Sequence, residues 1–517
     1  MSDTSSDLSR RGLLLAGGAA VTAAFTGPVA AMAQRVENAT AAKAGGCVAA
    51  DASTLVASPY GPTAPVKDIT TGLPLIELPA GFTYKSYGWR GDTMSDGLPT
   101  PAAHDGMGVV VSRRVGRSTE IILVRNHEQS TSSNAANIIG AGRDNVAKYD
   151  TGLTGSNYQI GGNTNLVFRD GSWVESYASL GGLYRPCAGG ASNWGSWLSN
   201  EEIRSNNVSS SGKRHGYIFE VPADTSENSV NTTPLFDMGR MAHEASALDT
   251  STGYWYLTED QGSANTLYRF LPNNVQGGLG SLHAGGRLQG LKVKNVVNAD
   301  LRFPTLCQEF SCEWVDIADP DLDGASIAIT GVGSAVSASG PYRQAYANGA
   351  AIFGANEGCW VANGTVFFTD KATGTSPVAR AGVIWALDLA TMTLKAIFVS
   401  RDRVVGNSPD NICISPRGGL LFNEDGGAGQ PSSGDASTQC LKVLNAQGNA
   451  YTFAKHNYNF TREQLDAAGK PLAPAGDERD SEWAGSVFSP DGRVLFVNLY
   501  TPGITLAITG PWSKGNL

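Results

Sequence analysis

The sequence is poor in charged residues, which make up only 16% of the chain, against roughly 25% in an average soluble protein. The charge that is present is acidic, with a formal net of −9, and lysines and arginines form no basic block. A protein that binds nucleic acid electrostatically needs such a block. We therefore exclude a nucleic-acid partner.

Two common cysteine and histidine motifs are also missing. The chain has seven cysteines, no C-x-x-C pair and no H-E-x-x-H sequence. A zinc ribbon, a thioredoxin-type site and the helix motif of zinc metalloproteases are thus excluded. Cys307 and Cys312 are close enough in the sequence to form a disulfide across a loop, but the sequence does not determine the pairing.

Beyond the N-terminal region, no hydrophobic run is long enough to span a membrane. Near the start, the pair Arg10-Arg11 precedes a small-residue apolar run that ends with the cleavage-site pattern Ala31-Met32-Ala33. Glycines and a proline make this run a poor permanent span. We predict a twin-arginine export signal at residues 1–33, read by the twin-arginine export machinery, and a periplasmic or secreted protein.

Glycine is abundant, with 63 residues among 517, which favours turn-rich β structure over helical bundles. One pattern recurs six times: a polar or acidic start, an apolar stretch, a glycine turn, a second apolar stretch and an acidic or amide end. The turn glycines are Gly116, Gly195, Gly253, Gly364, Gly418 and Gly492.

Repeated short strands with glycine turns are typical of β-propellers. We predict an all-β fold, a six-bladed β-propeller with irregular blades and loop insertions, as one domain over residues 80–517. A sandwich or two tandem β domains is the competing architecture. Residues 34–79 form a leader segment that either lacks order or wraps the propeller.

In an antiparallel hairpin the start of one strand and the end of the next lie at the same edge, so the polar ends of all repeats should converge at one channel mouth. Acidic side chains gathered there repel one another unless cations neutralise them. Hard cations such as Ca²⁺ take this kind of oxygen-rich site. Capping of solvated turns is the alternative role for any one acid. The acids predicted at the mouth are Asp105, Glu128, Glu201, Glu202, Glu244, Glu259, Asp260, Glu357, Asp370, Asp410, Glu424, Asp425 and Glu482.

Cys187 occupies the repeat position where other copies carry an acid. A thiolate among carboxylates suits a transition metal better than Ca²⁺, because sulfur is the softer donor. A buried structural cysteine or half of a disulfide is the other interpretation. His127 and His243 flank acids in the same ring and could bind metal, orient ligands or contact an anionic substrate.

Several ordered blocks resemble the PhoX-type alkaline phosphatases, an exported family of six-bladed propellers, over roughly residues 81–512. They include Arg125-Asn126-His127-Glu128, Cys187-Ala188-Gly189-Gly190, Ala242-His243-Glu244-Ala245 and Glu482-Trp483-Ala484-Gly485. The resemblance implies hydrolysis of small-molecule phosphomonoesters at a cluster of Fe³⁺ and Ca²⁺, with no organic cofactor. The metal ligands that it implies are Cys187, which binds iron, and Glu202, Glu244, Glu357, Asp410 and Glu482. Arg125 and His127 are the candidates for a catalytic clamp on the phosphoryl group.

One departure from the family pattern concerns phosphate binding. Family members commonly carry an arginine two residues before the acid that is Glu357 here, but this chain has Ala355. Loss of a bidentate phosphate contact should weaken the binding of anionic substrates. Another metal-dependent propeller hydrolase, of the lactonase or phosphotriesterase type, and a non-catalytic metal-stabilised binding propeller therefore remain alternatives. We expect a monomer.

Overall fold

The computed structural model describes residues 49–143, 146–152, 157–203, 211–224, 230–371, 381–426 and 438–517. Within these ranges the chain is almost entirely β structure, which confirms the all-β prediction. The two α-helices of this part are short: α2 (Gly340–Ala347) and α3 (Arg462–Ala467). Neither is long and apolar enough to cross a membrane. The predicted export signal lies outside the described residues.

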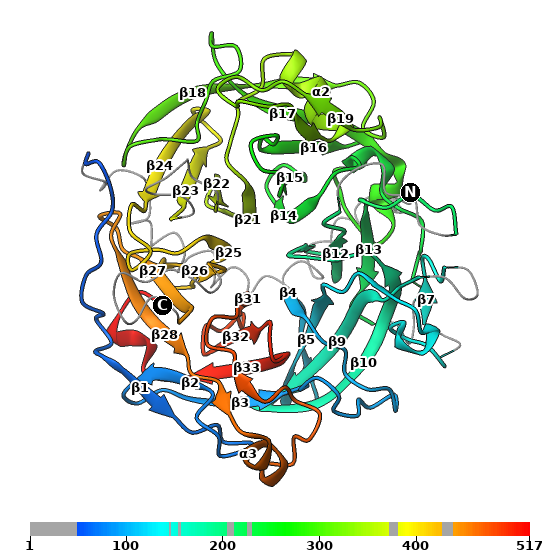
Figure 1. Ribbon diagram of the computed structural model, residues 1–517, viewed down its shortest axis with the longest axis vertical. Coiled ribbons are helices and arrows are strands. Elements are labelled where there is room, and N and C mark those ends of the chain that lie inside the picture. The colour runs from blue at the N-terminus through cyan, green and yellow to red at the C-terminus, as the bar shows by residue number, and fades with distance from the viewer. Residues whose placement is uncertain are drawn as a thin grey trace, which may run out of the picture.

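Each sequence repeat forms an antiparallel hairpin, and the inner strands of these hairpins surround the centre of a ring (Figure 1). The predicted hairpins are thereby confirmed, with a glycine at positive φ in every turn. The hairpins are β4 (His104–Val115) with β5 (Ser118–His127), β11 (Gly190–Ala191) with β12 (Ser196–Asn200), β14 (His243–Asp249) with β15 (Tyr254–Glu259), β21 (Asn356–Ala362) with β22 (Thr365–Asp370), β25 (Pro409–Ile414) with β26 (Leu420–Glu424), and β31 (Trp483–Phe488) with β32 (Val494–Leu499).

Further strands extend each hairpin outwards. They are β9 (Gly161–Arg169), β10 (Ser172–Leu183) and β7 (Ala147–Lys148) beside β5; β13 (Ile218–Pro222) beside β12; β16 (Tyr268–Pro272) and β17 (Gly286–Val293) beside β15; β23 (Val383–Asp388) and β24 (Thr393–Val399) beside β22; β27 (Cys440–Leu444) and β28 (Ala450–His456) beside β26; and β33 (Ile504–Thr509) beside β32. Small ribbons are formed by β6 (Thr131–Ser132) with β8 (Tyr158–Gln159), β19 (Ala325–Ile327) with β20 (Val336–Ala338), and β29 (Asn459–Phe460) with β30 (Gly476–Asp477).

This ring of antiparallel sheets is a β-propeller. One strand, β18 (Glu309–Ile317), pairs with both β17 and β24 and so joins two of the hairpin groups into a nine-stranded sheet. Because these two groups share one continuous sheet, the number of six blades stays a prediction that rests on the six hairpins.

The ring is closed by segments from near the N-terminus. Strand β3 (Thr83–Tyr87) pairs along its whole length with β33, close to the C-terminal end. Strands β1 (Thr63–Val66) and β2 (Ile76–Pro79) extend the sheet of β28. The described part of the predicted leader, residues 49–79, thus contributes strands to the propeller's edge.

The inner strands are apolar on both faces because each sheet packs between two neighbours. All six residues of β32 are buried, as are all six of β31. The largest apolar cluster joins the last sheet to the β25–β28 sheet through side chains such as Trp483, Phe453 and Trp512. Burial of this kind supplies roughly 25 cal/mol per Å² of apolar surface, so the central strands are held on both sides.

A register shift interrupts the pairing near the start of five inner strands. The shifts fall between His104 and Met107, His243 and Ser246, Asn356 and Cys359, Pro409 and Ile412, and Ala484 and Val487. A bulge changes the direction of nearby side chains and is common beside active sites. The recurrence at one end of the ring marks that end as the place to look for chemistry.

Candidate metal centre

In four of the five strands, the first residue within the register shift is a potential metal donor. These residues are Asp105, Glu244, Glu357 and Asp410; the fifth position is Gly485. In the remaining hairpin, Pro186 forms an isolated bridge with Glu201, and Cys187 follows it. Cys187 therefore stands at the same structural position as the acids, as the repeat predicted.

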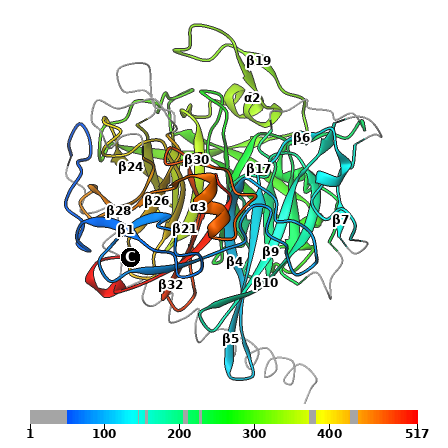
Figure 2. The ribbon, with the colours of Figure 1, turned by 60° about the horizontal axis from the view of Figure 1, so that its bottom comes forward.

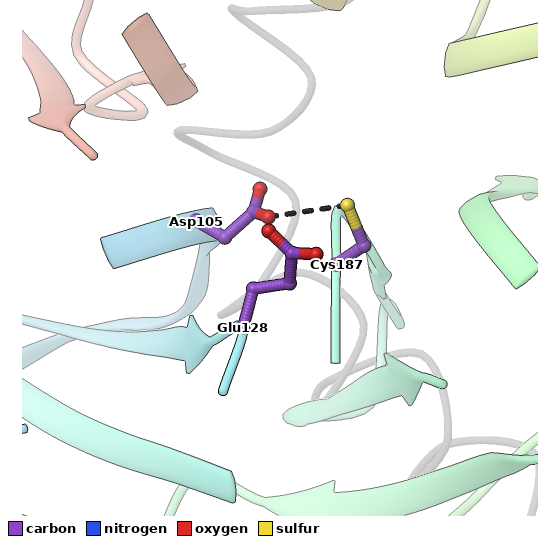
Figure 3. A group of neighbouring side chains, drawn as sticks. All are labelled: Asp105, Glu128 and Cys187. Carbon is purple, nitrogen blue, oxygen red and sulfur yellow. Dashed lines mark hydrogen bonds between the residues drawn. The ribbon is translucent and has the colours of Figure 1, made fainter. Parts of the chain in front are cut away.

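These donors converge at the centre of the ring. Three groups of side chains have ligand atoms within 4.8 Å of one another: Asp105, Glu128 and Cys187; Cys187, Glu202 and Glu244; and Glu244, Glu357 and Asp410. Shared members link the groups into one cluster, which we call the acid cluster. Figure 3 shows Asp105, Glu128 and Cys187 pointing toward one another.

A second layer of the acid cluster comes from the ends of the outer hairpin strands. Most of these strands end in a pair of polar residues, such as Glu201-Glu202 or Glu259-Asp260. Successive residues of a strand point to opposite faces, and here the second residue of each pair approaches the centre. Glu128 and Glu202 belong to the donor groups, and Lys371 contacts both Asp260 and Asp425.

The first residue of each pair instead accepts hydrogen bonds within its own blade. The prediction that Glu201, Glu259, Asp370 and Glu424 belong to the mouth was wrong, because their carboxylates accept hydrogen bonds within the blades. Glu201 accepts from His215 Nδ1 at 2.7 Å and Glu259 from the Tyr268 hydroxyl. Asp370 accepts from the Gly354 and Ala355 amides, and Glu424 from the Asn407 and Cys440 amides. Strand alternation could have separated these acids from their neighbours.

The deepest donors are buried without enough partners. Glu244 is 0% exposed and neither of its carboxylate oxygens has a hydrogen-bond partner; Asp105 Oδ1 also lacks one. Burial raises the pKa of Glu244 well above its usual range, and the nearby Asp410 and Asp105 raise it further. Buried acceptors without donors are costly. A bound cation would satisfy these oxygens, so the donor set fits a metal.

Cys187 adds a sulfur donor to this oxygen-rich set. It is a free cysteine, which excludes the disulfide interpretation, and its Sγ donates to Asp105 Oδ2 at 3.1 Å (Figure 3). Burial and then the Asp105 charge raise the pKa of the thiol. Since thiolates select transition metals and carboxylates suit Ca²⁺, the cluster fits a mixed set of cations.

Cys187 is held in place by a buried amide. Asn126 Nδ2 donates to the Cys187 carbonyl, while its Oδ1 accepts from Trp197 Nε1 at 3.0 Å and from Ser199 Oγ at 3.1 Å. The Cys187 amide donates to the Asn200 carbonyl at 2.9 Å. The backbone around the sulfur is therefore fixed by the neighbouring strands.

The Gly189-Gly190 pair follows Cys187, and the close approach of the neighbouring blade leaves no room for side chains there. Gly189 has a φ of +74°, and a Cβ on Gly190 would lie 1.8 Å from the Ser246 carbonyl oxygen. The loop that carries Cys187 can therefore approach the next blade only without side chains.

Two side-chain cations lie within the acid cluster, and sequence reasoning missed both. Arg185 contacts Glu128 and lies 2.6 Å from Glu202 through Nη2. Lys371 Nζ lies 2.7 Å from Glu357 Oε1. Lys371 could have been found from its repeat position, which is an acid in four of the other five hairpins, and Arg185 from its place two residues before Cys187.

The sequence-predicted metal ligands can now be placed. The structure brings Cys187, Glu202, Glu244, Glu357 and Asp410 together. Glu482 is not a member of the three donor groups found in the described ranges. Burial, and then the nearby charges of Asp425 and Asp105, raise the pKa of Glu482 well above its usual range. Metal binding by these six side chains stays a prediction.

The predicted catalytic pair, Arg125 and His127, lies beside the cluster rather than in it. Both are 0% exposed. Arg125 donates to Thr505 Oγ1 at 2.7 Å and Thr164 Oγ1 at 3.2 Å; His127 contacts the Ala102 carbonyl at 2.9 Å and Thr164 Oγ1 at 2.8 Å. Burial, and then the Arg125 charge, lower the pKa of His127 well below its usual range, so its imidazole is neutral.

His243, which was expected to act in the same ring, is likewise buried and bonds the Gly239 carbonyl through Nε2 at 2.9 Å. Burial lowers its pKa to about 4. These contacts tie the histidine to its own blade.

A central cavity of 390 Å³ adjoins the acid cluster. The residue after each inner-strand donor lines it, and the inner strands supply the rest of its largely apolar wall. The residues that directly follow the donors are Gly106, Ala188, Ala245, Gly358 and Asn411. The cluster thus lies between this apolar channel and the partly exposed outer layer.

Comparison with known proteins identifies relatives of this architecture. The family model described as alkaline phosphatase PhoX matches residues 58–179 and 167–503. Among solved structures, the chain is similar to Pseudomonas fluorescens PhoX in complex with vanadate, a transition state analogue. The two share 16% identity and a TM-score of 0.56, over 88% of this chain and 99% of that chain. At this identity the likeness shows the fold, a β-propeller.

Other likenesses are weaker. A gluconolactonase from Xanthomonas campestris shares 11% identity and a TM-score of 0.32, over 80% of this chain and 96% of that one. A putative 6-phosphogluconolactonase from Bacteroides uniformis shares 13% identity and a TM-score of 0.32, over 86% and 87%. These scores carry no argument about function. A search of curated proteins found no match.

The family match does not depend on these weak likenesses, because its two segments together span residues 58–503 of the 517-residue chain. It includes every strand that contributes a donor to the acid cluster. The chain belongs to the alkaline phosphatase PhoX family.

Proposed function

We propose that this protein is an exported, metal-dependent phosphatase that hydrolyses phosphomonoesters at the acid cluster. The observation that carries the proposal is the convergence of Cys187 with buried carboxylates whose oxygens lack partners, in a chain of the PhoX family. Such donors are costly to bury without cations. Metal cations held at the acid cluster would stabilise the negative charge of a transferring phosphoryl group.

The donor chemistry suggests how the ions are divided. Cys187 would hold iron, with Asp105, Glu202 and Glu244 as oxygen ligands beside it. Glu357, Asp410 and Glu482 would complete the oxygen-rich part, which suits calcium. When bound, the ions would supply Lewis acidity toward the phosphoryl oxygens. The protein's own part is to orient the donors and to bind the rest of the substrate.

Arg185 is placed to attract an anionic substrate. Its side chain is 40% exposed at the rim of the cluster and is held by Glu128 and Glu202. A guanidinium suits bidentate contact with phosphate. The catalytic role predicted for Arg125 and His127 stays untested. Because their side chains are fully buried behind the cluster, we propose that they act as positioning residues for the strand that carries Asn126 and leads to Glu128.

The position of Ala355 supports a weakened phosphate site. Its amide donates to Asp370 Oδ1 at 2.9 Å, and its carbonyl accepts from the Lys371 amide at 3.0 Å. No side-chain cation comes from this position. We propose a higher KM for phosphomonoesters than in relatives with arginine there. Ala355→Arg should lower that KM, and an unchanged KM would remove Ala355 from the substrate site.

The remaining parts of the proposal concern location. Residues 1–33 carry the twin-arginine pattern, so we propose export in the folded state to the periplasm or medium. A protein whose cluster must be loaded with several cations suits this route, since folded proteins are its cargo. We propose that the exported chain acts as a monomer.

The decisive assay compares three substrates. We expect the purified protein to hydrolyse p-nitrophenyl phosphate, to lose that activity in chelator, and to act poorly on a lactone and a phosphotriester. Lactone or phosphotriester hydrolysis as the main activity would overturn the reaction class. The absence of all three activities in metal-loaded protein would favour a binding propeller.

A further inference from the structure

Lys371 holds a position that distinguishes it from other lysines of the described chain. Its ammonium nitrogen lies within 4 Å of four carboxylates. The distances are 2.7 Å to Glu357 Oε1, 3.3 Å to Asp260 Oδ2, 3.5 Å to Asp425 Oδ2 and 3.8 Å to Asp410 Oδ2. The side chain is only 25% exposed. A single ammonium with four carboxylate neighbours lies where a bound metal cation would be expected.

The anchoring of Lys371 keeps it there. It directly follows β22, and its amide donates to the Ala355 carbonyl on the strand that leads to Glu357. The ammonium is therefore fixed to the hairpin that carries Glu357, and its other carboxylate partners come from the neighbouring hairpins.

The lysine overlaps one of the three donor groups. Glu357 and Asp410 both contact Lys371, and both belong to the group that also contains Glu244. The other two groups, around Cys187, contain no contact of Lys371. A metal ion at the Glu244 group would lie beside the ammonium and would be repelled by it, since like charges a few ångströms apart repel strongly.

The acid cluster thus has two halves. In the half around Cys187, the buried oxygen Asp105 Oδ1 has no partner, and within the described residues no side-chain cation reaches Cys187 or Asp105. Glu244, whose two oxygens also lack hydrogen-bond partners, belongs to both halves. In the half around Lys371, four carboxylates lie within 4 Å of one side-chain cation, which forms an ion pair with Glu357 Oε1. We propose that Lys371 is a resident cation that takes the place of one divalent metal ion on the Glu357–Asp410 side and so limits how many ions the protein holds. The inference rests on the proposed function, because it assumes that the cluster binds cations.

Calcium binding tests this directly. The protein is stripped with chelator, dialysed and titrated with Ca²⁺ alone, and the bound ion is counted by elemental analysis. We expect Lys371→Met to bind one more Ca²⁺ per chain than the unmodified protein, or to bind its weakest Ca²⁺ at least about tenfold more tightly. Lys371→Arg keeps the charge and should match the unmodified protein.

A matched control is Lys395→Met. Lys395 pairs with Glu309 at 2.6 Å on the outer strands, away from the cluster, so its replacement should leave the calcium count unchanged. If Lys371→Met folds only in calcium, its counting is done on protein purified in calcium, and this requirement itself supports the proposal. If it does not fold at all, Lys371→Gln is counted instead.

The outcomes separate the two proposals. Equal calcium number and affinity in Lys371→Met, Lys371→Arg and the unmodified protein would overturn the resident-cation role while leaving the metal cluster intact. A stripped unmodified protein that binds no Ca²⁺ and no iron would overturn the proposed function itself. A larger calcium-induced rise in Tm for Lys371→Met than for Lys395→Met would support the inference without any activity assay.

Discussion

Cys187 is the one residue whose chemistry sets this cluster apart from a purely carboxylate site. Its thiol lies 3.1 Å from Asp105 Oδ2 and belongs to two of the three donor groups. Asn126 and Asn200 hold the backbone of Cys187 and not its sulfur. Replacement of Cys187 should therefore affect metal binding without preventing the protein from folding.

We expect Cys187→Ala to lose its iron and its phosphatase activity while keeping its fold. Removal of one soft donor lowers affinity for a transition metal, but deletes only a small buried group, so the free energy of unfolding of the metal-free protein should change by no more than about 2 kcal/mol. Iron content measured beside urea unfolding checks this. Cys413→Ala, a buried free cysteine outside the donor groups, is the control. Unchanged iron in Cys187→Ala would remove this residue from the site.

At the scale of elements, the inner strands are held so close together that small residues are required between them. A Cβ on Gly106 would lie 1.8 Å from the Ala188 carbonyl oxygen, whereas Gly262 has nothing within 4 Å of the same position. Gly106 follows Asp105, so this contact sets the distance between two donor-bearing elements.

Gly106→Ala should therefore destabilise the protein by about 3 kcal/mol and impair metal binding, because backbone cannot move aside as a flexible side chain would. Gly262→Ala should be near neutral. Chemical denaturation of the two variants gives the comparison. A Gly106→Ala protein as stable as Gly262→Ala would show that the neighbouring blades have room to separate.

The first two sheets are also joined by a buried ionic triad. His215 lies between Asp150 Oδ2 at 3.0 Å and Glu201 Oε1 at 2.7 Å. Burial alone would lower the pKa of His215, but the two carboxylates outweigh it and raise the pKa to about 9. The histidine is therefore charged in the folded protein at neutral pH.

A histidine whose pKa is raised by folding stabilises the folded state. This contribution is complete below the pKa of the unfolded chain, about 6.5, and is lost as pH rises through the pKa of the folded protein. We expect the free energy of unfolding to fall by about 3 kcal/mol between pH 6.5 and 9 from this residue. His215→Gln should remove that part of the pH dependence, whereas His283→Gln should retain it. The same slope in both variants would show that another group causes it.

The element scale also shows what could be predicted from the sequence. The hairpins were predictable because each has a glycine turn between apolar stretches, and Cys187 could be aligned with acids by its place in the repeat. Lys371 and the division between Glu201 and Glu202 were not predicted. Strand alternation and the repeat position carry this information, but using them requires each strand end to be placed to within one residue, and the register shifts that displace those ends are not visible in residue spacing.

At the scale of the whole molecule, the chain closes its ring with strands from both ends. Strand β3 pairs with β33 along five residues, and β1 and β2 extend the neighbouring sheet beside β28. Figure 2 shows these N-terminal strands packed against the C-terminal part of the propeller. The sequence left open whether residues 34–79, which are rich in Ala, Thr and Pro, lack order or wrap the propeller, because long-range pairing of this kind leaves no local signal.

The net charge of −9 is also explained at this scale. Many of the acidic side chains converge at one end of the ring, where Arg185 and Lys371 neutralise only part of them. Excess charge concentrated in a buried cluster is costly unless the acids take up protons or cations bind there, and the proposed function assigns this role to bound cations. The cation content of the native protein is therefore the central quantity.

Elemental analysis of protein exported through its native pathway, purified without chelator, is the most direct test of the metal centre. We expect iron and calcium together in the folded protein, both removed by prolonged chelation along with phosphomonoesterase activity. Calcium alone would contradict the role given to Cys187. Folded, active protein with neither metal above the level of the buffer would contradict the metal centre as a whole.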